Sequence, residues 1–212
     1  MADSGTKIPT TISVRAPSKY VARPADAHAF VPPPLEWLYR TWSVTHSTLS
    51  MWRSAKNVRI TYKPYEADKS SSLAIDDLVE YEKRGSQSGV KTVEGIDRPD
   101  PSSPGAWDWR GKGWLRIASS HWEVLGYGQR PLAAAEGGEG VERWVVTWFA
   151  PTLFTQEGLD IYSDRREGLS RETLEAIMDA LKKLDEAPKI VTLVRKQMRP
   201  VEISLPWQEK KK

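Results

Sequence analysis

The chain has 212 residues, a formal net charge of +3 and no cysteine. The lack of cysteine excludes disulfides, thiolate metal sites and cysteine nucleophiles, and a small, scattered positive charge gives no argument for nucleic-acid binding. We expect one sizeable domain with polar tails, located in the cytoplasm, because no apolar run is typical of a signal peptide or a membrane span.

The first 34 residues are polar and end in Pro32, Pro33 and Pro34. Consecutive prolines disfavour both helix and central strand. We therefore expect residues 1–34 to form an extended or disordered arm. A domain over 35–199 and a basic tail over 200–212 follow it.

Eight segments have the alternation or the β-branched content typical of strands. They cover residues 41–49, 57–65, 72–85, 89–97, 107–117, 121–127, 143–150 and 159–165. An open antiparallel sheet of this length would leave two long edges exposed. We predict a mainly β fold, an eight-stranded antiparallel up-and-down β-barrel, whose interior is wide enough for one small ligand.

One amphipathic helix is predicted over residues 170–184, with Ser170 as its N-cap and Pro188 preventing its continuation. The apolar stripe of this helix consists of Leu174, Ile177, Met178 and Leu181. We expect that stripe to pack against the outside of the barrel, and residues 190–194 to form a last strand.

Three stretches resemble the lipocalins, or more broadly the calycin superfamily. "LYRTWSVTHS" resembles the first-strand signature, although Arg40 stands where the family usually has glycine, and "GKGWLRIASSHWEVLGYG" resembles the fifth and sixth strands. "RWVVTWFAPTLFTQEGLDIYSDRREGLSRETLEAIMDALKKL" resembles the bacterial-type pattern of two strands and a helix, and "KIVTLVRKQ" occupies the place of the closing strand.

This resemblance covers about residues 37–198 and implies a barrel that binds a small apolar or aromatic molecule. It implies a structural floor in which Arg195 packs over Trp42 as a cation–π pair. Some superfamily members are enzymes that isomerise, cyclise or de-epoxidise lipids and terpenoids. Certain fungal proteins of lipocalin-like fold guide ring closures, which would place this chain in secondary metabolism.

Ten tryptophans and seven tyrosines suit the wall of a hollow barrel, because broad, rigid rings fill volume without a second sheet behind them. The candidate ligand-binding residues are Trp42, Val44, His46, Tyr62, Tyr81, Glu94, Trp109, His121, Trp144 and Trp148. His121 could equally face outward, and not every tryptophan can point inward, since one bulge reverses a strand.

His46 and Asp77 are the candidate catalytic couple if the protein is an enzyme. Asp77 lies on an apolar strand face, where a carboxylate needs a partner or a raised pKa, and a nearby imidazole would complete an acid–base pair. His46 could instead be a buried neutral imidazole with a hydrogen-bond partner. The histidine spacing predicts no metal site and no cofactor, although a haem barrel would need only one axial histidine, His46 or His121.

Three functions stay open at this point. The first is a binding module for a small apolar or aromatic molecule. The second is a lipocalin-fold isomerase, cyclase or dehydratase acting on a lipid, terpenoid or polyketide-type natural product. The third is a filled barrel that serves as an interaction scaffold. The ligand, the oligomeric state and the place of the N-terminal arm relative to the barrel mouth stay open as well.

Overall fold

The computed structural model describes residues 7–21, 30–66, 73–86, 88–132, 140–152 and 155–209. The strands are β1 (Thr41–Ser47), β2 (Ala55–Pro64), β3 (Ile75–Lys83), β4 (Val90–Pro99), β5 (Ala106–Gly111), β6 (Ser119–Pro131), β7 (Val141–Phe149), β8 (Gly158–Ser163) and β9 (Arg199–Pro200). The helical elements are η1 (Ser18–Tyr20), α2 (Leu35–Leu38), η2 (Ser50–Ser54), η3 (Gly113–Ile117), α3 (Arg171–Lys182) and α4 (Pro188–Gln197). The predicted tail residues Lys210, Lys211 and Lys212 lie outside the described residues.

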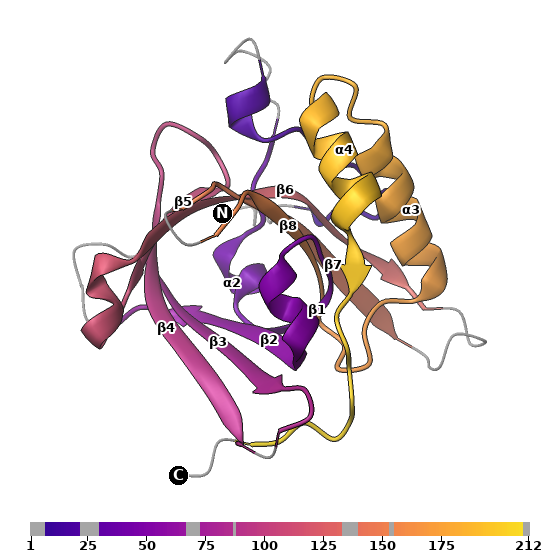
Figure 1. The fold of residues 1–212 in the computed structure, drawn as a ribbon. Helices are drawn as coiled ribbons and strands as arrows, with labels where there is room; N and C mark the ends of the chain where they lie inside the picture. The colour runs from indigo at the N-terminus through magenta and orange to yellow at the C-terminus, as the bar shows by residue number, and fades with distance from the viewer. Residues whose placement is uncertain are drawn as a thin grey trace, which may run out of the picture.

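Strands β1 to β8 form a closed antiparallel barrel (Figure 1). Each strand pairs with the next along the chain, and β1 also pairs with β8, so the sheet meets its own edge. Closure leaves none of these eight strands as an edge. The short β9 pairs with β1 on the outside, opposite His46 and Ser47. The predicted eight-stranded up-and-down barrel is confirmed.

The predicted fifth strand is shorter than expected. It ends at Gly111, and Gly113, with a φ of +57°, starts the 3₁₀ turn η3. A left-handed φ is one that glycine adopts without strain, so the chain leaves the sheet at this point. Trp114 and Ile117 therefore lie on a protruding turn with 86% and 90% of their surface exposed, and Trp114 belongs to no strand.

Two helices, rather than one, cover the outer side of the barrel (Figure 1). Helix α3 begins at the expected N-cap, where the Ser170 side chain accepts a hydrogen bond from the Thr173 N–H at 3.2 Å. The prediction of a last strand over 190–194 is wrong, because these residues belong to α4. Pro188 stands at the first turn of α4, a position that tolerates proline, and Ile190 and Val194 are buried one turn apart.

The apolar residues divide into an inner and an outer cluster. The inner cluster fills part of the barrel lumen and includes Trp42, Val44, Tyr62, Trp107 and Trp122. The outer cluster lies between the barrel wall and the two helices and includes Trp144, Trp148, Ile161, Ile177 and Ile190. Strands β7 and β8 contribute to both clusters, so they are buried on both faces.

The N-terminal residues 7–21 run along the outer face of β6. The Arg15 N–H donates to the Leu125 carbonyl at 2.8 Å, and the Gln129 N–H donates to the Pro9 carbonyl at 2.9 Å. Gly126 makes this close approach possible, because a Cβ atom there would lie 2.5 Å from the Ser13 carbonyl oxygen. Among the described residues, no helix is long and apolar enough to span a membrane.

Candidate functional site

An aromatic stack crosses the barrel lumen. The rings of Tyr62 on β2 and Trp122 on β6 are parallel within 4°, with centroids 5.7 Å apart, and Trp107 stacks on Trp122 at 6.0 Å. Strands β2 and β6 are not neighbours in the sheet, so their contact spans the interior. The stack therefore separates the lumen into two halves.

The half on the α2 side is filled. Trp42 is fully buried, and its Nε1 donates to the Leu38 carbonyl of α2 at 2.9 Å, while Trp37 packs on Trp42 with ring centroids 5.3 Å apart. The Arg40 guanidinium lies over the rings of both Trp37 and Trp42, at 5.3 and 5.4 Å. The expected Arg195–Trp42 contact is wrong, because Arg195 is exposed on α4. The cation over Trp42 instead comes from Arg40, the residue at the position where the lipocalin resemblance predicted glycine.

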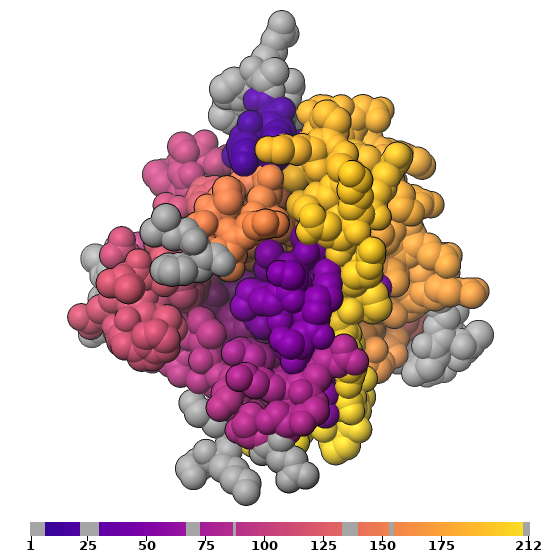
Figure 2. All heavy atoms as spheres, viewed as in Figure 1, coloured from indigo at the N-terminus to yellow at the C-terminus, as the bar shows by residue number. Residues whose placement is uncertain are grey.

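The other half contains a cavity of about 310 Å³. Its rim comes from η2, η3 and the connection between β7 and β8, and η2 stands at the centre of this face in Figure 2 (purple). The residues lining it are Leu49, Met51, Trp52, Ile60, Tyr62, Asp77, Val79, Val93, Trp109, Leu115, Ala118, Ser119, Ser120, Trp122, Phe149, Thr152, Thr155, Asp160 and Tyr162. Neither residues 7–21 nor residues 30–38 take part in this lining, so the described parts of the N-terminal arm do not plug the mouth.

Two carboxyl groups stand in the wall of this cavity. Asp77 on β3 and Asp160 on β8 are 7% and 1% exposed, and they come from strands that are not neighbours. Within the described part of the chain, the Oδ1 atoms of both have no hydrogen-bond partner. A third carboxyl, Asp97 on β4, is fully buried and accepts a hydrogen bond from Trp122 Nε1 at 2.8 Å. Buried polar atoms normally have partners, so these unpaired oxygens single out the cavity wall as the candidate site.

Burial changes the acid–base behaviour of these groups. Desolvation raises the pKa of Asp160 to about 7 and that of Asp97 to about 7, although the Trp122 hydrogen bond opposes the second shift. Desolvation and the nearby Asp97 raise the pKa of Asp77 well above its usual value. Burial also raises the pKa of Tyr62 and Tyr162. The cavity wall thus carries one carboxyl, Asp160, whose pKa lies near neutral pH.

Six of the sequence-predicted residues face the lumen. Tyr62, Asp77 and Trp109 line the cavity itself. The Trp109 ring covers Gly95 on β4 so closely that a side chain at Gly95 would collide with it. Tyr81 packs edge-on against Trp52 at 5.5 Å, beside the cavity, and Val44 and Trp42 belong to the inner cluster.

His46 faces outward, and the expected His46–Asp77 couple does not form. A bulge between Val44 and His46 shifts the register, so that Val44 stands opposite Tyr162 but His46 stands opposite Ile161, a residue of the outer cluster. The extra residue moves His46 to the other side of the sheet. Burial lowers the pKa of His46 to about 4, so its imidazole is neutral at physiological pH.

Three other predicted residues also lie outside the lumen. Glu94 is exposed, because its strand turns Val93, Gly95 and Asp97 inward. Trp144 and Trp148 belong to the outer cluster, beneath the helices. The prediction that these three residues contact a ligand in the lumen is therefore wrong, since the barrel wall stands between them and the cavity.

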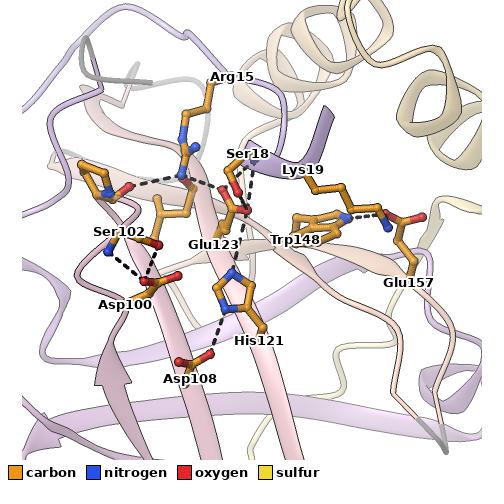
Figure 3. Close-up of polar contacts among 12 residues, drawn as sticks. Arg15, Ser18, Lys19, Asp100, Ser102, Asp108, His121, Glu123, Trp148 and Glu157 are labelled. Carbon is orange, nitrogen blue, oxygen red and sulfur yellow. Dashed lines mark hydrogen bonds and ion pairs between the residues drawn. The ribbon is translucent and has the colours of Figure 1, made fainter. Parts of the chain in front are cut away.

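His121 also lies on the outer face, in a polar cluster with the N-terminal residues (Figure 3). Its Nδ1 is 2.9 Å from Asp108 Oδ1, and its Nε2 is 3.9 Å from Glu123 Oε1. Glu123 in turn accepts a hydrogen bond from the Ser18 hydroxyl at 2.6 Å and pairs with Arg15 at 3.0 Å. This cluster attaches the N-terminal residues to β6 and faces away from the cavity.

The sequence reasoning missed the most unusual group in the cavity, Asp160. Strand β8 reads Leu159–Asp160–Ile161–Tyr162, and all four residues are buried. A strand buried on both faces loses the apolar–polar alternation that reveals which side chains point inward. The available signal was that Asp160 and Tyr162 are two residues apart and so share a face.

Comparisons with known proteins agree with this architecture. No protein-family model matches the chain. Botcinic acid biosynthesis cluster B protein 12 of Botryotinia fuckeliana (strain B05.10) is 29% identical over 176 residues, which cover 81% of this chain and 76% of that protein. Among solved structures, apocrustacyanin C2 has a TM-score of 0.54 at 10% identity, and H1 crustacyanin from the lobster Homarus americanus has a TM-score of 0.54 at 12% identity. Each alignment covers 94% of both chains, and the likeness shows that this chain has the lipocalin fold.

Proposed function

We propose that this lipocalin-fold chain binds a small, largely apolar or aromatic molecule in the cavity beside the Tyr62–Trp122 stack. The observation that carries the proposal is a cavity of about 310 Å³ with two unpaired carboxyl oxygens in its wall. Ligand pockets are typically apolar hollows with a few convergent polar groups, starting at roughly 300 Å³. The lining matches that description, since aromatic and aliphatic side chains surround Asp77 and Asp160.

The relative from a botcinic acid biosynthesis cluster supports a role in making a natural product. In that case the bound molecule would be an intermediate or a product of a biosynthetic route. A planar, unsaturated molecule could pack against the aromatic side chains of the stack that line the cavity, Tyr62 and Trp122.

A second candidate function is catalysis of an isomerisation, cyclisation or dehydration in the same cavity. The pKa of about 7 at Asp160 favours it, because a group that is half-protonated near neutral pH can both donate and accept a proton. The acid–base groups would then be Asp160 and Asp77, instead of His46 and Asp77.

Filling the cavity tests the binding proposal. Val93→Phe adds a ring to the cavity wall, and Val141→Phe makes the same change at an exposed end of β7. We expect aromatic probes to bind the wild-type chain and to bind Val93→Phe at least about tenfold more weakly, a loss of ~1.4 kcal/mol. Val141→Phe should bind like the wild type, as measured by calorimetry.

Native mass spectrometry of the protein purified from its source would identify a molecule that copurifies with it. Equal affinity of the wild type and Val93→Phe for every probe would contradict the proposal, because the probes would then bind elsewhere. Turnover of a copurified molecule, lost in Asp160→Asn while binding persists, would favour the enzyme over the binding module.

A further inference from the structure

The carboxyls Asp77 and Asp160 are the charge-bearing side chains among the described residues that line the cavity, apart from the tyrosine phenols. Among the described residues that line the cavity, none is Lys, Arg or His, whereas Asp77 and Asp160 are carboxyls. The other polar side-chain groups are hydroxyls, among them those of Tyr62, Tyr162, Ser119 and Ser120, and the indole N–H groups of Trp52, Trp109 and Trp122. A guest that enters this cavity therefore meets carboxyls, hydroxyls and neutral N–H groups but no cationic side chain.

The unpaired oxygens of Asp77 and Asp160 are more than nine-tenths buried. Asp77 stands opposite Tyr62 across the β2–β3 pair, and Asp160 stands opposite Ser47 across the β1–β8 pair. An ammonium group offers three donors in a compact space, and it can satisfy the unpaired oxygen of whichever carboxyl it meets. A carboxylate guest would leave both oxygens unpaired and would add like charge in a desolvated site, which is costly.

The aromatic rings point to the same chemistry. Trp52 and Trp109 line the cavity, and the face of a tryptophan ring attracts a cation more strongly than other aromatic faces do. A neutral hydrocarbon would use these rings only as apolar surface. A guest with an amine at one end and an apolar body would use both the rings and the carboxyls.

We infer that the cavity selects a guest whose polar end is an amine or a similar hydrogen-bond donor, and discriminates against a carboxylate of the same shape. This inference rests on the proposed binding function, and it assigns Asp77 and Asp160 as the residues that determine specificity.

The charged neighbours of the two carboxyls set the conditions of the test. Asp77 lies near Asp76, Asp97, Trp109 and Lys112, and its carboxyl in turn acts on the phenols of Tyr62 and Tyr162. Asp160 lies near Ser47, Trp52, Tyr162 and Arg53, whose guanidinium donates to the Ser47 and Gln197 carbonyls, each at 2.8 Å. Arg53 and Lys112 do not line the cavity, so they reduce the negative field without meeting the guest.

Three probes of one shape separate the alternatives: 1-naphthylmethylamine, 1-naphthoic acid and 1-ethylnaphthalene. Calorimetric titration at pH 8 should give an affinity for the amine at least about tenfold higher than for the carboxylate, with the neutral probe in between. At pH 5.5 the preference should shrink, because Asp160 is then protonated while the amine keeps its charge.

Asp160→Asn removes the charge and keeps the shape, and it should lower the preference for the amine by about tenfold. The matched control is Asp108→Asn, which makes the same change at an exposed carboxyl on the outer face. That control should leave all three affinities unchanged.

Two results would overturn the inference. If the neutral probe binds and the carboxylate binds at least as tightly as the amine at pH 8, the specificity is wrong while the binding function stands. If none of the three probes binds, both proposals are wrong.

Discussion

The buried carboxyl groups on the two sides of the barrel wall differ in one respect. Glu123 and Glu142, on the outer face, are fully buried, as are Asp97 and, within a few per cent, Asp77 and Asp160 in the lumen. The outer carboxylates are surrounded by donors, whereas each inner carboxyl keeps one oxygen without a partner among the described residues. Burial alone therefore does not distinguish the inner carboxyls from the outer ones; the difference is the oxygen atom that each inner carboxyl keeps without a partner.

The outer carboxylates connect distant parts of the chain. Glu123 accepts hydrogen bonds from the N–H and the hydroxyl of Ser18 and pairs with Arg15, which fastens the N-terminal residues to β6 (Figure 3). Glu142 accepts hydrogen bonds from the Ser170 N–H at 2.9 Å and the Ser170 hydroxyl at 2.6 Å, which attaches the start of α3 to β7. These contacts are structural, because every one of them joins two elements of the fold.

The largest effect is expected on the outer side. Glu123→Ala removes the carboxylate that pairs with the Arg15 guanidinium and accepts from the Ser18 N–H, and removing one member of a buried ion pair costs roughly 3–5 kcal/mol. We expect the free energy of unfolding at pH 7 to fall by about that amount in chemical denaturation. A loss below about 1 kcal/mol would mean that the N-terminal residues contribute little to stability.

Asp160, in the lumen, should lower the stability of the folded chain when it loses its proton, whereas ionised Glu123 raises it. The pKa of Asp160 is about 7 in the folded chain and about 3.9 when unfolded, so the folded state binds the proton more tightly. The contribution of Asp160 to stability is therefore complete below about pH 4 and is lost as the pH rises to about 7.

Comparison with Asp160→Asn isolates this effect. The wild type should lose stability relative to the variant by up to ~1.4 kcal/mol per pH unit across that range, measured by denaturation at several pH values. If the free energies of unfolding of the two proteins changed with pH in the same way, the pKa of Asp160 would not change on folding. That result would contradict burial of this carboxyl with one oxygen unpaired.

A smaller loss is expected where the N-terminal residues approach the sheet. Gly126→Ala places a methyl group 2.5 Å from the Ser13 carbonyl oxygen, so the N-terminal segment must shift. Overpacking of this kind costs typically about 1–3 kcal/mol. The control is Ser50→Ala, at the exposed start of η2. A second glycine such as Gly89 would not serve, because its positive φ makes any substitution there strained. Equal midpoints of thermal unfolding for Gly126→Ala and Ser50→Ala would contradict this account of the contact.

The smallest effect is expected for His46. Because the bulge turns His46 to the outer side, His46→Gln should leave the affinity for cavity probes within about twofold of the wild type, below 0.5 kcal/mol. Asp77→Asn, on the lumen side, should change the affinity for the amine probe. A strong loss of binding in His46→Gln would place the imidazole in the lumen.

Regular stretches of the chain were predictable from the sequence. Unbroken alternation along β2 and β3 correctly placed Tyr62 and Asp77 on inward faces, and the Ser170 cap predicted where α3 begins. These features depend on neighbours within a few residues, so the local pattern carries the information.

Elsewhere the local pattern was ambiguous, and long-range contacts decided the outcome. The bulge in β1 turns His46 outward, and residues 188–197 form a helix whose Ile190 and Val194 pack in the outer cluster on the closed barrel. Trp144 and Trp148 lie on one face of β7, and the sequence pattern could not show that this apolar face points outward. The two helices α3 and α4 cover it, so both tryptophans are buried outside the barrel.

The amino-acid sequence favours a closed barrel, because an open sheet of eight successive strands would leave two long edges exposed. Contacts between distant residues settle which half of the lumen is filled and which carboxyls lie in the cavity. The Tyr62–Trp122 stack joins strands that are not neighbours, and the buried Glu123 carboxylate is paired by Ser18, which lies 105 positions earlier in the chain, so no local pattern reveals either contact.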